Sequence, residues 1–205
     1  ENRPTEAYET RVLAPKTAAQ LLDALSLEQG DDVLVVGAGI GYTVAIAAEL
    51  AGPRHVHAID IDRKLVSVAR SNLDAAGFGE VLVDRRNGTE GLPEYAPYDR
   101  ILLEAAVVRP PRPLLNQLSP EGRIVFPEGA TRQRIAVAEA ADGPRGYDVL
   151  DRLAHVRLAP LLASGERSRG PARNRTVRED AEFERQGYFA RSGWEYEWVD
   201  WDDQL

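Results

Sequence analysis

Cysteine is absent from this sequence of 205 residues, and lysine occurs only at Lys16 and Lys64. The absence of cysteine excludes disulfide bonds, thiolate catalysis and cysteine-based metal sites. The three histidines, His55, His57 and His155, lack the spacing of a metal-binding helix pair. We therefore expect the histidines to be structural and predict no metal site.

Long apolar runs are also missing. No run approaches the roughly 18 residues that a membrane-spanning helix needs, and no signal peptide is visible. We therefore expect a cytoplasmic protein without a membrane partner. The net charge is −8, and because nucleic-acid affinity depends on clustered Lys and Arg, we expect no nucleic-acid partner.

The composition is typical of a folded domain, with 43% hydrophobic and 28% charged residues. From about residue 164 the chain becomes rich in Arg and Glu, so we predict one domain over residues 1–162 and a polar extension over 163–205. A capping box at residues 176–179 predicts a helix. Residues 193–201 carry all three tryptophans. We expect these aromatics to dock on their own domain, with docking over the functional site or on a second subunit, in a homo- or hetero-oligomer, as alternatives.

Strands and helices alternate along the first domain. Apolar runs predict strands at residues 32–36, 55–59, 81–83, 98–103, 122–126, 134–140 and 149–158. Helical patterns predict one helix that begins at residue 15 and further helices at residues 43–50, 62–76 and 114–118. This order predicts an α/β fold: a Rossmann-like open, mostly parallel sheet with helices on both faces and an antiparallel edge hairpin.

A glycine cluster follows the first predicted strand. Residues 37–41 are Gly-Ala-Gly-Ile-Gly, directly before the helix at 43–50. Such glycines let the backbone approach a ligand, and the helix N-terminus offers free N–H groups. A dinucleotide fingerprint needs its third glycine where the chain has Tyr42. The spacing favours S-adenosyl-L-methionine (SAM), whose carboxypropyl group such a loop can wrap; a purely structural turn is the alternative.

Polar residues end the next two strands. Asp60 can accept hydrogen bonds from both ribose hydroxyls of a nucleotide, whereas Asp62 is better placed to cap the following helix. Asn87 and Gly88 follow the third strand, where they either contact the adenine edge or form a simple turn. Asp84 is an alternative for the adenine contact.

The sequence resembles the protein-L-isoaspartate O-methyltransferase family. Residues 33–42 resemble its first SAM motif, residues 91–103 its segment around the fourth strand, and residues 111–127 the following helix and strand; residues 155–161 are similar to its closing strand. The resemblance covers about residues 12–162. It implies that SAM is the methyl donor, S-adenosyl-L-homocysteine (SAH) the product, and the side-chain carboxylate of isoaspartyl residues the acceptor, a reaction that starts protein repair.

Three positions depart from the family pattern. Leu13 replaces the serine of the family's substrate loop, Val35 lies where an acid usually helps to fix the amino-acid moiety of SAM, and Glu104 replaces a small or hydroxyl residue. Glu104 has three interpretations: a general base for a nucleophile that carries a proton, a partner for the SAM ammonium, or a charge that repels a carboxylate substrate. A carboxylate nucleophile needs no base.

We predict a SAM-dependent O-methyltransferase that acts on a protein or peptide carboxylate. The alternatives are a SAM-binding relative with another acceptor, a non-catalytic partner subunit that has lost the substrate loop, and a nicotinamide-binding protein. The predicted catalytic residue is Glu104. The predicted cofactor-binding residues are Val36, Gly37, Ala38, Gly39, Gly41, Tyr42, Asp60, Ile61, Asn87, Gly88 and Glu104.

Overall fold

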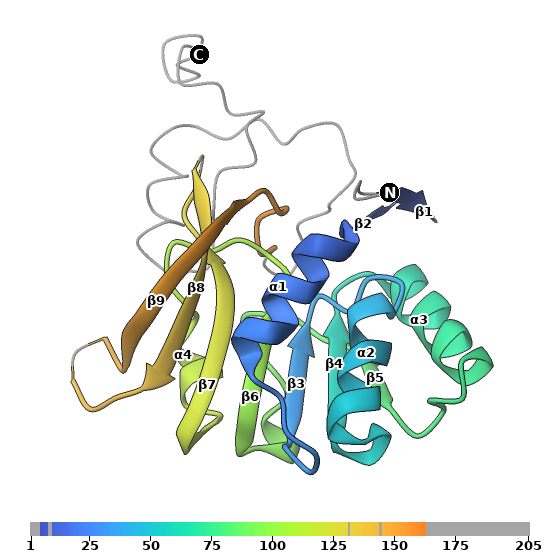
Figure 1. Ribbon diagram of the computed structural model, residues 1–205. Helices are drawn as coiled ribbons and strands as arrows, with labels where there is room; N and C mark the ends of the chain where they lie inside the picture. Colours follow the sequence, from blue (N-terminus) through green and yellow to red (C-terminus); the bar gives the residue numbers. More distant parts are fainter. Residues whose placement is uncertain (1–4, 8–9, 131, 144, 163–205) are drawn as a thin grey trace, which may run out of the picture.

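A seven-stranded sheet forms the centre of the molecule, with its strands in the order β5-β4-β3-β6-β7-β8-β9 (Figure 1). This computed structural model describes residues 5–7, 10–130, 132–143 and 145–162. The strands are β3 (Val33–Val36), β4 (Val56–Asp60), β5 (Leu82–Arg85), β6 (Tyr98–Leu103), β7 (Leu118–Glu128), β8 (Gln133–Ala140) and β9 (Tyr147–Val156). The first five are parallel, whereas β8 and β9 pair antiparallel at one edge. The predicted Rossmann-like fold is therefore confirmed.

Helices cover both faces of the sheet, but unequally. Figure 1 shows α1 (Pro15–Leu25), α2 (Tyr42–Ala51) and α3 (Arg63–Ala75) on the near face, and α4 (Arg112–Leu115) behind β7. All four residues of β3 are buried, as a central parallel strand requires. Because successive side chains of a strand point to opposite faces, Val33 and Val35 pack with α1, α2 and α3, while Leu34 and Val36 pack with α4.

Local sequence signals explain where the helices begin. Pro15 is the first residue of α1, where its missing N–H costs nothing. Asp62 caps α3, because its carboxylate accepts a hydrogen bond from the N–H of Lys64 at 2.7 Å. The predicted capping role of Asp62 is therefore confirmed.

The helix predicted at residues 114–118 is shorter in the structure. α4 ends at Leu115, and Leu118 already belongs to β7. The buried amide of Gln117 accepts a hydrogen bond from the N–H of Leu92 at 2.9 Å and donates one to the carbonyl of Glu90 at 2.7 Å. These contacts with a distant segment hold the chain where local pattern favours another helical turn.

Two further features lie outside the predictions. Residues near the start form a short hairpin of β1 (Thr5–Ala7) and β2 (Thr10–Val12), and 3-10 turns occur at η1 (Pro53–His55) and η2 (Pro93–Tyr95).

Within the residues that the structure describes, no helix is long and apolar enough to cross a membrane. The helix predicted from the capping box at 176–179 lies outside the described residues.

Candidate functional site

The candidate site lies where three neighbouring parallel strands end. Val36, the last residue of β3, is level with Ile59 of β4 and Leu103 of β6. The residues that follow these strands, the glycine loop at 37–41, Asp60 and Glu104, therefore meet at one edge of the sheet. The N–H of Glu104 also donates to the carbonyl of Val36 at 2.8 Å. Ligands of open α/β sheets bind at this carboxyl edge.

Two glycines of the loop permit close contacts with neighbouring elements. Gly37 has a φ of +95°, and a Cβ there would lie 3.3 Å from the Cβ of Glu104. Gly41, the N-cap of α2 with a φ of +89°, would place a Cβ 3.3 Å from the carbonyl oxygen of Ala69 on α3. Both positions combine a left-handed backbone with a close neighbour, so both favour glycine.

The Asp60 carboxylate holds the glycine loop by a hydrogen bond. Its Oδ2 accepts a hydrogen bond from the N–H of Gly39 at 2.9 Å, and its Oδ1 accepts one from the N–H of Asp62 at 2.9 Å. Burial raises the pKa of Asp60, although these two N–H donors oppose the shift. An ionised carboxylate has about four acceptor positions. Asp60 can therefore hold the loop and still accept hydrogen bonds from a ligand such as a ribose diol.

Glu104 lies beside the loop and contacts the first turn of α2. The hydroxyl of Thr43 donates a hydrogen bond to Oε1 of Glu104. Burial raises the pKa of Glu104 to about 7; the Thr43 hydrogen bond opposes the shift, and the charge of Asp60 adds to it. None of the ion pairs formed among the described residues includes Glu104. This carboxylate is partly withdrawn from water, and no described residue places a cation in an ion pair with it.

A small cavity connects Glu104 to the segment before α1. Its lining consists of Val12, Leu13, Ala38, Gly39, Ile40, Tyr42, Thr43 and Glu104. The structure thus places Leu13 and Tyr42 at the same cavity as the glycine loop. Val35, in contrast, is fully buried between the sheet and its helices.

The loop after β5 is held by its own contacts. The Oδ1 of Asn87 accepts a hydrogen bond from the N–H of Thr89, and its Nδ2 donates to Oε1 of Glu90, both at 3.1 Å. A Cβ on Gly88 would lie 2.8 Å from Cγ1 of Val36. Asn87 thus forms a turn and Gly88 has a packing role. Their contact with adenine stays a prediction.

Asp84 and Ile61 also form contacts within the protein. Asp84 forms an ion pair with Arg70 at 2.9 Å, and the carbonyl of Ile61 accepts a hydrogen bond from Nε of Arg85 at 3.3 Å. Both lie at the strand ends beside Asp60, since Asp60 is level with Arg85.

Sequence reasoning missed Thr43 and Val12. Thr43 is the one polar residue among the buried residues of α2, which are otherwise Val and Ala, and this contrast is a signal that could have identified it. No comparable signal marks Val12. Its position at the cavity depends on how the chain enters α1.

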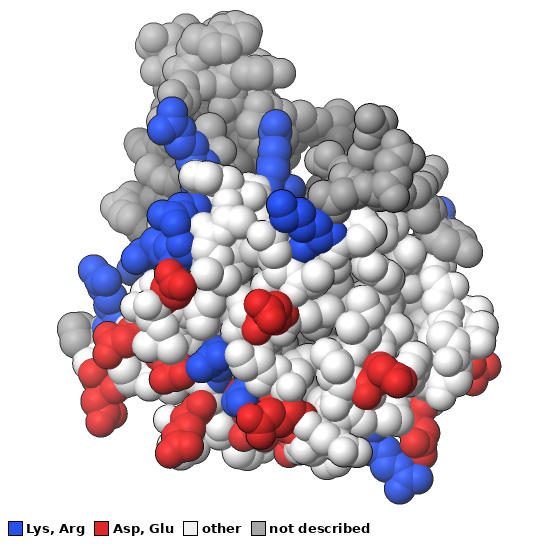
Figure 2. All heavy atoms as spheres, viewed as in Figure 1, with Lys and Arg blue, Asp and Glu red and all other residues white. Residues whose placement is uncertain are grey.

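Charge is distributed unevenly around this edge. Figure 2 shows most Lys and Arg side chains of the displayed face toward the upper end, where the carboxyl ends of the parallel strands lie in Figure 1, and most acidic ones lower down. Arg132, Arg134 and Arg157, beside the start of β8 and the end of β9, are exposed. The site end is therefore locally more basic than the net charge suggests.

A parallel sheet with a glycine loop after its central strand and a carboxylate after the next one defines the class: a Rossmann-like nucleotide-binding domain of the methyltransferase type. Solved structures support this fold. One described as a protein-L-isoaspartate O-methyltransferase from Plasmodium falciparum, in complex with SAH, superposes with a TM-score of 0.62 at 20% identity, over 79% of this chain and 81% of its own.

The family follows from sequence. The family model for protein-L-isoaspartate(D-aspartate) O-methyltransferase matches residues 3–165. A protein-L-isoaspartate O-methyltransferase of Methanocella arvoryzae is 39% identical over 150 residues, 69% of this chain and 80% of the relative. One from Rhodopseudomonas palustris is 38% identical over 179 residues, 84% and 78% respectively. The chain belongs to the protein-L-isoaspartate O-methyltransferase family.

The predicted family membership is therefore confirmed. Members of this family are SAM-dependent methyltransferases, so the comparisons support the prediction of a methyltransferase and do not favour a non-catalytic partner subunit. The roles of the individual site residues remain predictions.

Proposed function

We propose that this chain is a SAM-dependent O-methyltransferase that methylates the side-chain carboxylate of isoaspartyl residues in proteins or peptides. One observation carries the proposal. In a chain whose residues 3–165 match this family, the glycine loop, Asp60 and Glu104 converge on one edge of the sheet.

The contacts at this edge of the sheet support the following roles in cofactor binding. Asp60 has acceptor positions left for the ribose hydroxyls, and the loop at 37–41 offers backbone N–H groups and room for the amino-acid chain. Tyr42 begins α2 and is 37% exposed, so it can cover the bound molecule from the solvent side. We assign Val36, Ala38 and Ile61 to backbone or apolar contacts in the same site, and Asn87 and Gly88 to its adenine end.

The chemistry asks the protein mainly for alignment. Bound SAM supplies a methyl group activated by a sulfonium. A carboxylate oxygen of the acceptor forms a bond to the methyl carbon while the carbon–sulfur bond breaks, so the electron pair returns to sulfur and SAH is the product. No proton is transferred. The residues of this chain need only align the two reactants and exclude water.

The acceptor approaches from the basic side of the site. An isoaspartyl carboxylate is an anion, and the exposed arginines at 132, 134 and 157 lie at the same end of the sheet. Such a field raises the rate of encounter with an anionic substrate. Val12 and Leu13 supply an apolar wall at the cavity instead of a hydroxyl.

A second candidate function rests on Glu104. A carboxylate with a pKa of about 7 beside the site can act as a general base for an acceptor that carries a proton, such as an alcohol. In that case the fold and the cofactor are retained but the acceptor differs.

Methyl transfer to matched peptides tests the proposal. With methyl-labelled SAM, we expect base-labile methyl esters on a peptide that contains isoaspartate and none on the same peptide with normal aspartate. Asp60→Ala, assayed at a SAM concentration below saturation, is the low-activity control. If the protein binds SAM but esterifies neither peptide, the isoaspartyl function is wrong, and a proton-bearing acceptor becomes the next test.

The remaining predictions concern domain organisation, assembly and location. We propose that residues 163–205 are an extension of the domain at 1–162, and that the protein works in the cytoplasm. We propose that the aromatic segment at 193–201 docks on this domain, with docking over the functional site or on a second subunit as alternatives. Light scattering of the full chain and of a chain ending at residue 162 tests the oligomer. If both chains form assemblies with the same number of subunits, the extension has no role in assembly.

A further inference from the structure

Two carboxylates flank the glycine loop, one on each side of β3. Asp60 ends β4 and Glu104 follows β6, and both strands pair directly with β3. Neighbouring strands are about 4.8 Å apart, so the backbones of these residues are roughly 10 Å apart. A ligand that lies across the tip of β3 can therefore contact one carboxylate with each of its ends.

Of these two carboxylates, Glu104 receives fewer hydrogen bonds from the described residues. Asp60 accepts two backbone N–H groups, whereas the described residues supply Glu104 with the Thr43 hydroxyl and no ion pair. A carboxylate that is withdrawn from water without a cation is costly. Its position at a cavity indicates that a cationic group of a ligand completes the site.

The placement of Glu104 indicates which cation this is. Its Cβ is next to Gly37 and its carboxyl group contacts Thr43, so it lies where the loop meets the first turn of α2. If Asp60 holds the ribose, the amino-acid end of SAM extends across β3 toward Glu104. That end carries an α-ammonium group with three N–H donors, which matches an acceptor-only carboxylate.

We propose that Glu104 binds the α-amino group of SAM and that Thr43 is a positioning residue that orients the Glu104 carboxylate. This inference rests on the proposed function, because it requires SAM at this site. It assigns Glu104 to cofactor binding and not to proton transfer. Thr43 holds one oxygen of Glu104, which leaves the other oxygen to face the ammonium group.

Calorimetry with matched ligands tests the role of Glu104. The ligands are SAH and its desamino analogue, in which hydrogen replaces the α-amino group. At pH 8 we expect Glu104→Gln to weaken SAH about 10- to 100-fold, because a hydrogen bond between charged groups is lost. The desamino analogue should bind the parent and the variant alike. Glu49→Gln, which removes an exposed charge from the same helix as Thr43, should change neither affinity.

The pH dependence gives a second readout. The affinity of the parent for SAH should fall as the pH drops below about 7, because protonated Glu104 loses its charge while the ammonium keeps its own. The affinity of Glu104→Gln should depend less on pH, and what dependence remains should come from Asp60, the carboxylate whose charge acts on Glu104. Thr43→Val should move the midpoint of the parent's profile to higher pH, because it removes the hydrogen bond that lowers the pKa of Glu104. A change in packing alone would leave that midpoint in place.

Three outcomes overturn the inference. Equal losses for SAH and the desamino analogue would make Glu104 structural. Unchanged SAH affinity with lost methyl transfer would make it a general base. Absence of SAH and SAM binding by the parent chain at millimolar ligand would remove the proposed function itself, which is a distinguishable result because it does not depend on any variant.

Discussion

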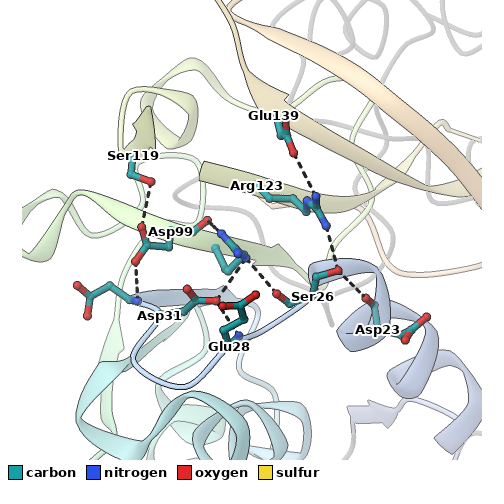
Figure 3. Close-up of polar contacts among 10 residues, drawn as sticks. Asp23, Ser26, Glu28, Asp31, Asp99, Ser119, Arg123 and Glu139 are labelled. Atoms are coloured by element: carbon teal, nitrogen blue, oxygen red, sulfur yellow. Dashed lines mark hydrogen bonds and ion pairs between the residues drawn. The ribbon is translucent and has the colours of Figure 1, made fainter. Parts of the chain in front are cut away.

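The two ends of the parallel sheet treat charge in opposite ways. At the amino end, where β3 and β6 begin, Asp99 accepts hydrogen bonds from the N–H of Asp32 at 3.0 Å and from the hydroxyl of Ser119 at 3.1 Å (Figure 3). Arg123 connects the hydroxyl of Ser26 at 3.0 Å with the carboxylate of Glu139 at 3.1 Å. The acids here have partners within the protein.

At the carboxyl end, Asp60 and Glu104 lie on either side of β3, and neither forms an ion pair with another described residue. Burial raises the pKa of both groups, and the negative charge of Asp60 raises the pKa of Glu104 further. One end of the sheet is thus built for stability and the other for a ligand. Stability is commonly reduced where a site must accept a ligand.

The largest expected effect is at Gly37. Gly37→Val places a branched side chain at a φ of +95° and against Glu104. We expect the free energy of unfolding to fall by about 2–4 kcal/mol. We also expect SAM binding to be lost completely. Gly30→Val is the matched control, because Gly30 has a φ of +92° with open space around it and precedes β3 at the amino end. It should lose stability but keep SAM affinity; loss of binding in both variants would contradict the contrast between the ends.

Asp60→Ala should have the next largest effect. It removes the acceptor for the N–H groups of Gly39 and Asp62 and the proposed ribose ligand. We expect SAM affinity, measured by calorimetry, to fall about 10- to 100-fold. Asp74→Ala, which removes an exposed carboxylate from the last turn of α3, should change it less than about threefold. Similar losses in the two variants would show that Asp60 has no special role.

Asp99→Ala tests the amino end. It leaves the N–H of Asp32 and the hydroxyl of Ser119 without their acceptor. Urea denaturation should show a loss of about 1–3 kcal/mol. SAM affinity should stay within about twofold of the parent, and a larger change would mean that the two ends are coupled.

The smallest expected effect is a gain of stability. The folded pKa of Glu104 is about 7, above its ordinary value of 4.5, so the folded state binds a proton more tightly than the unfolded state. Parent stability is therefore lost as the pH rises from about 4.5 to 7. Without ligand, Glu104→Gln should be more stable than the parent by about 1–2 kcal/mol at pH 8 and by less at pH 5. An equal difference at both pH values in urea denaturation would contradict this cost.

The core of the fold was accessible from sequence because its signals are local. The continuous apolar run of β3, the proline that begins α1 and the aspartate that caps α3 each act within a few residues. The helix expected at 114–118 ends earlier than predicted, at Leu115, because Gln117 forms hydrogen bonds with residues some 25 positions earlier in the chain. The glycine loop and Asp60 were predicted as one site since consecutive parallel strands end at the same edge.

By itself, the sequence determined the family, the alternation of strands and helices, and the residues that follow each strand tip. These depend on short motifs and on periodicity. The tertiary structure alone decided that Thr43 contacts Glu104, that Leu13 lines the same cavity, and that Gly88 packs against Val36. Those contacts join segments that are far apart in the chain. Only the packing of the sheet against its helices and loops brings these segments into contact. The same packing buries Glu104 and so raises its pKa.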